Sequence, residues 1–521
     1  MTGTGLPPDA SLVHRPSPDV SPAVNEPDPA GPDLPDWTVC VALAAAVRAV
    51  AALVLPVLPE EAYHWLYAKH LDYGYYDHPP MIAWLIALGT SVFGDGTVGI
   101  RFFPWLCSIG TSIAAASTAR RLYGDRTASW TALLLALQPV TLLASSFGFP
   151  DASLLLFWSL GLAFVVQALQ SRRGAWWLAA GAALGAGMLS KYTAVFLGAS
   201  LTIYLLVTPK DRSWLRTPWP YLGAVVALVV FTPVVSWNAA HDWASLRFQS
   251  VGRLEEGRSP RVTSALLYVL LQAGSIMPLT VPAAVAAVVA GLKSGSADRR
   301  FLLCLSLPLL GFFFCVGFTR STHAFWPLPA WVALTILTAD YLAGGKGPLV
   351  RFYRSQWGAF AAISIAAAGI GLAHSVEPLP GLTPIRSLTG WEAIAGRASR
   401  LHSSLPADSF YLGVGRRYSC PAQLAYHLHA PGNVHSKNLL GEEGLQFTYW
   451  ADLKVLRGKD AVIVAEGDWS PTLGDLLRQH FHRVDEDGIP LVVEGSGLRR
   501  GAKEERYVFY VGHEYDPVRR P

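Results

Sequence analysis

Side chains that could do chemistry are concentrated in one short segment, residues 59–80 (PEEAYHWLYAKHLDYGYYDHPP). Its acidic and histidine residues are Glu60, Glu61, His64, His70, Asp72, Asp77 and His78. Glu60 and Glu61 directly follow a long apolar run, where a carboxylate is costly unless it has a partner or a task. Because adjacent residues of a helix point about 100° apart, one glutamate can face a site while the other contacts a structural partner.

The end of this segment is conformationally restricted. Pro79 disfavours the α conformation for His78, so the Asp77–His78 dipeptide is expected to be extended at the membrane surface. An interfacial amphipathic segment, with aromatic rings at headgroup depth and charges in water, would explain the same composition. Residues 59–80 therefore predict either a catalytic loop or a surface segment of the membrane domain.

Four more polar residues stand at the ends of apolar runs: Asp151, Lys191, Arg320 and His323. Asp151 precedes an apolar helical pattern, so an N-cap that suits the helix dipole is one interpretation. Lys191 lies between two apolar segments, where it either snorkels to the interface or lines a cavity and contacts an anionic phosphate. The same two alternatives hold for Arg320 and His323.

The composition indicates which elements must position these residues. Of 521 residues, 52% are apolar and only 15% are charged, whereas soluble proteins average about 25% charged residues. The chain is therefore expected to be an α-helical polytopic membrane protein. A net charge of +4 is too small to indicate a nucleic-acid partner. The 5 cysteines show no pattern of a disulfide framework or a zinc site.

Apolar runs long enough to cross about 30 Å of hydrocarbon predict about eleven transmembrane helices. They are expected near residues 37–58, 97–118, 127–146, 152–170, 174–190, 194–208, 219–237, 263–290, 301–318, 325–342 and 357–374. Arg and Lys gather in every second connection, which makes those connections cytoplasmic by the positive-inside rule. The loop 238–262 is an exception, because it carries arginines on the side expected to be external.

Both ends of the chain differ from this helical region, which spans residues 37–374. Residues 1–36 contain 9 prolines and almost no large apolar residues, which predicts a disordered tail. Over residues 375–521, short apolar stretches alternate with helical ones, which predicts a small α/β domain. The expected topology places the N-terminus in the cytoplasm and this α/β domain outside it.

The same topology gives the scattered candidates a common location. The residues expected at the non-cytoplasmic face are Glu60, Asp77, His78, Asp151, Lys191, Arg320 and His323. Acids and cations at this level, beneath an external domain, suit an enzyme that acts on a lipid-anchored anionic substrate.

Three motifs resemble those of a known family. Glu60-Glu61-Ala-Tyr-His-Trp, followed by Gly74-Tyr-Tyr-Asp-His-Pro-Pro80, is similar to the first-loop signature of the dolichyl-phosphate-mannose protein mannosyltransferase superfamily, whose members have the GT-C fold. Phe149-Pro-Asp151 and Leu189-Ser-Lys-Tyr-Thr193 resemble later motifs of that superfamily. The likeness covers roughly residues 40–340 and is closest to bacterial members related to the lipid A aminoarabinose transferases.

The resemblance implies transfer of a sugar from a polyprenyl-phosphate carrier to an envelope acceptor at the outer face of the bacterial cytoplasmic membrane. It implies Glu60 as the general base, or as the group that orients the acceptor, with Asp151 as a second carboxylate and Glu61 in the catalytic set. The residues implied in binding the donor or its phosphate are Lys191, Tyr192, Arg320, His323, His78 and Tyr63. The sugar and the acceptor (glycolipid, polysaccharide or protein) are left open.

The sequence departs from the family pattern at two places. The family usually opens with Asp-Glu, and this chain has Glu60-Glu61. The aminoarabinose transferases have Glu-Lys before the paired prolines, and this chain has Asp77-His78. His78 can bind phosphate only when it is protonated; the alternative is a divalent metal held by Asp77 and a histidine such as His241. Dependence on a metal therefore stays open.

Functions from other classes remain as alternatives. A transporter or flippase of a lipid-linked sugar would place ionisable residues in the middle of its spans, often in two repeated halves. The sequence shows no internal repeat, and its candidates cluster at span ends, which favours an enzyme. A third alternative is a non-catalytic scaffold of an envelope complex.

Overall fold

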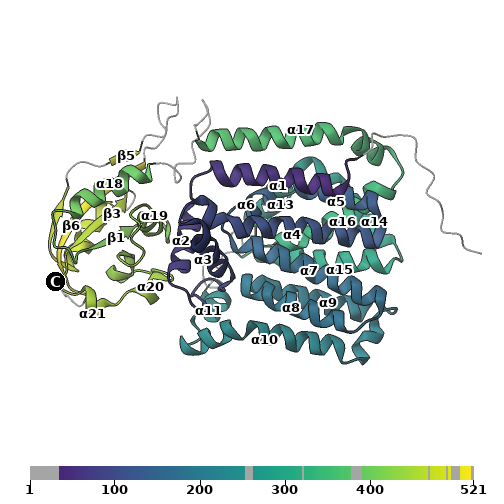
Figure 1. Ribbon diagram of the computed structural model, residues 1–521, viewed down its shortest axis with the longest axis horizontal. Helices are drawn as coiled ribbons and strands as arrows, with labels where there is room; N and C mark the ends of the chain where they lie inside the picture. Colours follow the sequence, from purple (N-terminus) through teal and green to yellow (C-terminus); the bar gives the residue numbers. More distant parts are fainter. Residues whose placement is uncertain are drawn as a thin grey trace, which may run out of the picture.

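The computed structural model describes residues 34–252, 262–319, 322–376, 390–467, 470–487, 491–493 and 505–517. Of the tail predicted to be disordered, only residues 34–36 are among the described residues. The candidate Arg320 lies outside the described residues. The described chain is mostly helical. Its long helices run side by side, and its strands gather in one sheet at the end of the bundle where α2 and α3 lie (Figure 1).

Helices form where the apolar runs predict them. Those of the bundle are α1 (Trp37–Val54), α4 (Thr97–Tyr123), α5 (Asp125–Leu137), α6 (Pro139–Ser146), α7 (Pro150–Ser171), α8 (Ala175–Ser190), α9 (Val195–Val207), α10 (Trp219–Ala240), α13 (Val262–Ser275), α14 (Val281–Lys293), α15 (Ala297–Gly317), α16 (Leu328–Gly344) and α17 (Pro348–Val376). Shorter helices at the sheet end are α2 (Pro59–Lys69), α3 (Met81–Phe93) and α11 (Ala244–Arg247).

Within the described residues, five helices are individually long and apolar enough to cross a membrane: α1, α4, α7, α10 and α15. The number rises to seven if each of two bent pairs forms one span. These pairs are α13 with α14, bent by 92°, and α16 with α17, bent by 104°. The chain is a multi-pass membrane protein, but the predicted number of about eleven spans is not confirmed.

Prolines divide two of the runs that predict single helices. The run 127–146 breaks at Gln138, and Pro139 begins α6. The run 263–290 breaks after Ser275, and Pro278 begins a short 3-10 turn that leads into α14. Proline lacks the amide hydrogen that would continue the preceding helix, but it is well tolerated in the first turn of the next.

The C-terminal strands form a mixed sheet. They are β1 (Phe410–Val414), β2 (Val434–Ser436), β3 (Ala461–Glu466), β4 (Phe481–Glu486), β5 (Leu491–Val493) and β6 (Glu505–Tyr515). The order is β2-β1-β3-β6-β4, and β5 also pairs with β6. β1 is parallel to β2 and β3, whereas β6 is antiparallel to β3, β4 and β5.

Helices α18 (Trp391–His402), α19 (Ser419–His427), α20 (Phe447–Trp450), α21 (Leu453–Leu456) and α22 (Ser470–Arg478) accompany the sheet. Strands β1, β3, β5 and β6 contain the short apolar stretches from which an α/β fold is predicted, so that fold class is confirmed. The domain boundary near residue 375 stays a prediction.

The sheet-bearing part of the chain packs directly on α2. Gln423 of α19 donates its side-chain amide to the carbonyl oxygen of Val57 at 2.9 Å. The ring of Tyr418, just before α19, stacks on Tyr63 of α2 with centroids 4.2 Å apart. Side chains of α2, α3, α19 and β3 share one buried apolar cluster. Helix α2, which begins this segment, therefore packs against the sheet-bearing part of the chain at the end of the helix bundle.

Candidate active site

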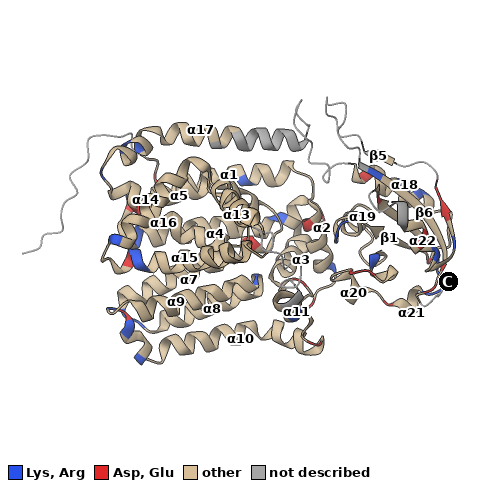
Figure 2. Cartoon of the chain, turned by 180° about the vertical axis from the view of Figure 1, so that it is seen from behind, with Lys and Arg blue, Asp and Glu red and all other residues tan. Residues whose placement is uncertain are grey.

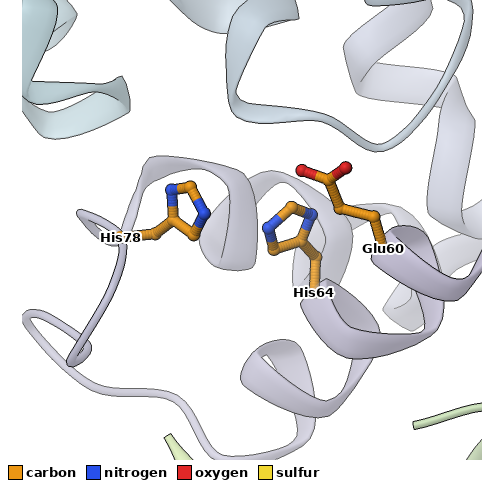
Figure 3. A group of neighbouring side chains, drawn as sticks. All are labelled: Glu60, His64 and His78. Atoms are coloured by element: carbon orange, nitrogen blue, oxygen red, sulfur yellow. The ribbon is translucent and has the colours of Figure 1, made fainter. Parts of the chain in front are cut away.

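Three side chains from the first connection converge on one point: Glu60, His64 and His78 (Figure 3). Glu60 and His64 lie four residues apart on α2 and so share a face of that helix. His78 comes from a segment of bends that precedes α3. One potential ligand atom from each side chain lies within 4.8 Å of the other two. Glu60 and His78 are half-buried, and His64 is fully buried.

The protonation of His64 follows from its surroundings. Its Nδ1 lies 2.9 Å from the carbonyl oxygen of Gly148. Because a carbonyl can only accept, Nδ1 must carry the proton, and Nε2 keeps its lone pair. Nε2 is buried and has no hydrogen-bond partner among the described residues. Burial lowers the pKa of His64 to about 4, so the ring is neutral at pH 7.

Glu61 is not one of these three side chains and forms a buried ion pair with Arg101 of α4. Arg101 Nε lies 2.8 Å from Glu61 Oε1, and Glu61 Oε1 also accepts the amide hydrogen of Gly148 at 2.8 Å. Both charged side chains are almost completely buried. Glu61 therefore holds the loop that orients His64, which is the structural role that one of two adjacent glutamates can take.

Glu60 lies in a different electrostatic environment from its neighbour. The pKa of Glu60 is raised to about 7, chiefly by burial; the Lys191 ammonium lowers it, and the carboxylates of Asp151, Asp77 and Glu61 contribute to raising it. The structure therefore brings Glu60 within electrostatic range of Asp151 and Lys191, which are far apart in the sequence. A carboxylate with a pKa near 7 can accept a proton at physiological pH.

Asp151 and Lys191 form an ion pair beside this carboxylate. Lys191 Nζ lies 2.9 Å from both carboxylate oxygens of Asp151. Asp151 is the second residue of α7, and Phe149 takes the N-cap position, so the N-cap interpretation of Asp151 is wrong. Lys191 interrupts the helix between α8 and α9 in an extended conformation. The neighbouring Tyr192 hydroxyl lies 2.7 Å from Ser245 Oγ on α11.

Asp77 and Tyr63 tie the first connection to the sheet-bearing part. Buried Asp77 accepts hydrogen bonds from the hydroxyls of Tyr63 and Tyr67. The Tyr63 hydroxyl also accepts the amide hydrogen of Gln446 at 3.1 Å. Gln249 donates its side-chain amide to the carbonyl oxygen of Asp77 at 2.8 Å. These contacts fix the turn that carries His78.

Other candidates lie apart from this arrangement. His241 Nδ1 lies 2.8 Å from the carbonyl oxygen of Trp237, and its ring stacks on that indole. His323 is exposed, with its ring near Trp326. Among the described residues, the three-ligand group that could hold a metal contains neither Asp77 nor His241.

His64 is a site residue that the sequence argument does not single out. The sequence feature that could have identified His64 is its spacing of four residues from Glu60. That spacing places them on one face only when residues 59–69 are helical.

Three comparisons place this chain among known proteins. The family model described as dolichyl-phosphate-mannose-protein mannosyltransferase matches residues 77–237. The lipid A galacturonosyltransferase RgtD of Rhizobium johnstonii is 30% identical over 293 residues, which are 55% of this chain and 61% of that protein. The undecaprenyl phosphate-α-4-amino-4-deoxy-L-arabinose arabinosyl transferase of Pseudomonas savastanoi pv. phaseolicola is 24% identical over 385 residues, 67% of this chain and 68% of that protein.

A solved structure extends the likeness to nearly the whole chain. ArnT from Cupriavidus metallidurans, crystallised with bound undecaprenyl phosphate, matches with a TM-score of 0.64 and 19% sequence identity, covering 91% of this chain and 97% of that one. At this identity the match shows a shared fold. The family model, the relatives and the fold agree with the first-loop motifs, and together they show that the chain is similar to bacterial GT-C glycosyltransferases of the aminoarabinose-transferase type.

Proposed function

We propose that this chain transfers a sugar from a polyprenyl-phosphate carrier to an envelope acceptor on the non-cytoplasmic side of the membrane. The observation that carries the proposal is the position of Glu60, whose carboxylate lies within electrostatic range of the Asp151–Lys191 ion pair at the end of the bundle covered by the sheet. RgtD is named for transfer to lipid A, and ArnT binds undecaprenyl phosphate. Both relatives support a lipid-linked donor.

In the proposed reaction, the acceptor hydroxyl oxygen attacks the anomeric carbon of the sugar. The bond between this carbon and the phosphate oxygen breaks, and its electron pair leaves with the polyprenyl phosphate. Glu60 takes the proton of the acceptor hydroxyl. Because the leaving phosphate is already a stable anion, no strong general acid is needed.

Lys191 and Asp151 have complementary tasks in this reaction. The Lys191 ammonium has three N–H donors, and it can share them between the Asp151 carboxylate and a phosphate oxygen. This cation stabilises negative charge that grows on the departing phosphate. Asp151 orients the ammonium, and its own negative charge stabilises the positive charge that develops on the sugar. We assign Tyr192 and His78 to the edge of the donor site.

The orientation of the site follows from the distribution of charge. Many Lys and Arg residues gather at the end of the bundle remote from the sheet (Figure 2). The positive-inside rule assigns that end to the cytoplasm. The sheet, Glu60 and the Asp151–Lys191 pair then lie on the outer side, where the α/β domain can help select the acceptor. This orientation argues against a flippase, which would use ionisable groups near the membrane midplane.

The test is transfer by purified protein in liposomes. The donors are labelled undecaprenyl-phosphate sugars, beginning with galacturonic acid and 4-amino-4-deoxy-arabinose, and the acceptor panel begins with lipid A. We expect labelled acceptor together with free undecaprenyl phosphate, and about 10²–10³-fold slower transfer for Asp151→Asn. Translocation of intact donor without cleavage of the sugar–phosphate bond would overturn the proposal in favour of a transporter.

A matched control separates loss of the site from loss of an ion pair. Asp340 pairs with Arg299 at 2.9 Å, between the end of α16 and the start of α15. Asp340→Asn removes the same charge from a partly buried pair outside the proposed site. It should leave the rate of transfer per folded protein unchanged.

A further inference from the structure

We propose that Glu60, His64 and His78 together bind one divalent transition-metal ion of the Zn²⁺ type. Two imidazoles and one carboxylate are a ligand set that proteins use for Zn²⁺ and for similar ions with open coordination positions. Binding of the ion can be tested without any transfer activity. Its outcome is therefore separate from that of the proposed reaction.

The geometry of the three side chains is close to that of a bound site. Their ligand atoms lie within 4.8 Å of one another. In a tetrahedral zinc site, with bonds of about 2.0–2.2 Å, ligand atoms are about 3.3–3.5 Å apart. Binding would draw the ligand atoms closer together, and Glu60 and His78, which would have to rotate, are only half-buried. Figure 3 shows the His64 ring between the other two side chains.

His64 is held as a metal ligand is usually held. Its Nδ1–H donates to the carbonyl oxygen of Gly148 at 2.9 Å. Such a contact fixes the ring and leaves the other nitrogen to face the ion. That other nitrogen, Nε2, is completely buried and has no hydrogen-bond partner among the described residues. An orphaned buried acceptor costs free energy, and a metal ion would satisfy it.

The backbone at Gly148, which accepts the hydrogen bond from His64, is itself held in place. Gly148 is fixed in turn, because its amide donates to Glu61 Oε1 at 2.8 Å. A methyl group in place of its α-hydrogen would lie 3.0 Å from Ile100 Cγ2 and 3.2 Å from Ile86 Cδ1, so the loop passes close over α3 and α4. The Arg101–Glu61 pair thus positions His64 through one backbone unit.

Charge at the site also favours a cation. The carboxylates of Asp151, Asp77 and Glu61 act on Glu60 together with the ammonium of Lys191. Glu61 is balanced by its ion pair with Arg101. The remaining carboxylates, Glu60 included, outnumber Lys191 by two charges, which a dication would balance. With three protein ligands, the ion keeps a position for an oxygen atom of a substrate, and the second oxygen of Glu60 can still take a proton.

The direct test is metal binding by the full chain in detergent. Protein stripped with chelator is titrated with Zn²⁺ and, for its visible absorption spectrum, with Co²⁺. We expect about one ion per chain and no comparable binding of Mg²⁺ or Ca²⁺, which prefer all-oxygen ligands. His78→Gln and Glu60→Gln should each weaken Zn²⁺ binding by more than about tenfold, since even the loss of an outer-shell contact costs about 10–100-fold.

His241→Gln is the matched control, because His241 stacks on Trp237 and lies outside the three-residue group. Its Zn²⁺ affinity should equal that of the parent protein. Thermal unfolding confirms that the His78→Gln, Glu60→Gln and His241→Gln variants are folded before their Zn²⁺ affinities are compared. Absence of stoichiometric Zn²⁺ and Co²⁺ binding would overturn the proposal. Loss of binding in His241→Gln with retention in His78→Gln would overturn it as well.

Discussion

We propose different roles for the adjacent glutamates Glu60 and Glu61, and two isosteric substitutions test the difference. Glu60→Gln removes a carboxylate from the proposed catalytic position. Glu61→Gln removes the carboxylate that pairs with Arg101 inside the protein. Each change replaces one oxygen by an amide nitrogen and leaves the size of the side chain nearly unchanged. Differences between the variants therefore report the role of each charge.

The expected loss of stability in Glu61→Gln follows from burial of the ion pair. Glu61 and Arg101 are 0% and 1% exposed, and removing one partner of a buried pair costs about 3–5 kcal/mol. Arg101 also donates to the carbonyl oxygens of Ala52, Leu55 and Pro56, each at 2.7 Å. These contacts keep part of its hydrogen bonding, so we expect a loss near the lower end, about 3 kcal/mol.

Glu60→Gln should behave in the opposite way. Burial disfavours the charged form of Glu60, so loss of its charge should not lower the unfolding temperature. Transfer should fall by about 10²–10⁴-fold, which is the usual contribution of a general base. Glu61→Gln should retain more transfer activity per folded protein than Glu60→Gln.

The assay measures both properties on the same preparations, by thermal unfolding in detergent and by transfer in liposomes. For a domain of about 150–250 residues, 1 kcal/mol corresponds to roughly 2–4 °C, and to less for a larger chain. Glu61→Gln should thus unfold at least a few degrees below the parent protein. Unchanged unfolding of Glu61→Gln, or an equal decrease in Glu60→Gln, would refute the assignment of roles.

Three further predictions concern the rest of the site. Lys191→Met should raise the KM for the lipid-linked donor by about 10–100-fold, because a charge-assisted hydrogen bond contributes about 1.5–3 kcal/mol; an unchanged KM would exclude Lys191 from the phosphate site. In chelator-treated protein, kcat/KM should fall about tenfold per unit below about pH 7, because burial raises the pKa of Glu60 to about 7 and only the ionised carboxylate accepts a proton. A rate that stays flat down to pH 5.5 would contradict this. Tyr418→Ala should speed hydrogen exchange in α19 several-fold, since the stacked pair with Tyr63 contributes about 0.5–1.5 kcal/mol; equal acceleration in β1 and β3 would indicate general unfolding of the sheet instead.

Much of the architecture is predictable because the length of an apolar run is a local property. The runs near residues 97–118, 152–170 and 219–237 all form helices. Within residues 375–521, the alternation of short apolar stretches with helical ones likewise corresponds to strands such as β1 and helices such as α19. The bend of 92° between α13 and α14 is less accessible to such reasoning, because the hydrophobic pattern continues through Pro278.

Which charged side chains of the candidate site pair with one another depends on tertiary structure, so the sequence predicts these pairs only in part. The carboxylate of Asp151 and the cation of Lys191 are both expected at the outer face. Their ion pair, however, joins the start of α7 to the break between α8 and α9, which no local sequence pattern predicts. The partner of Glu61, Arg101, lies on α4, and no local pattern connects them. His64 becomes a candidate only when residues 59–69 are known to be helical.

The central claim is that the donor phosphate binds at Lys191 with its sugar facing Glu60. A structure of the protein in a lipid nanodisc with a non-cleavable polyprenyl-phosphate-sugar analogue tests it most directly. We predict a phosphate oxygen within about 4 Å of Lys191 Nζ, the usual ion-pair limit, and the anomeric carbon between this phosphate and the Glu60 carboxylate. A phosphate bound at the opposite end of the bundle, near Arg299, would contradict the account.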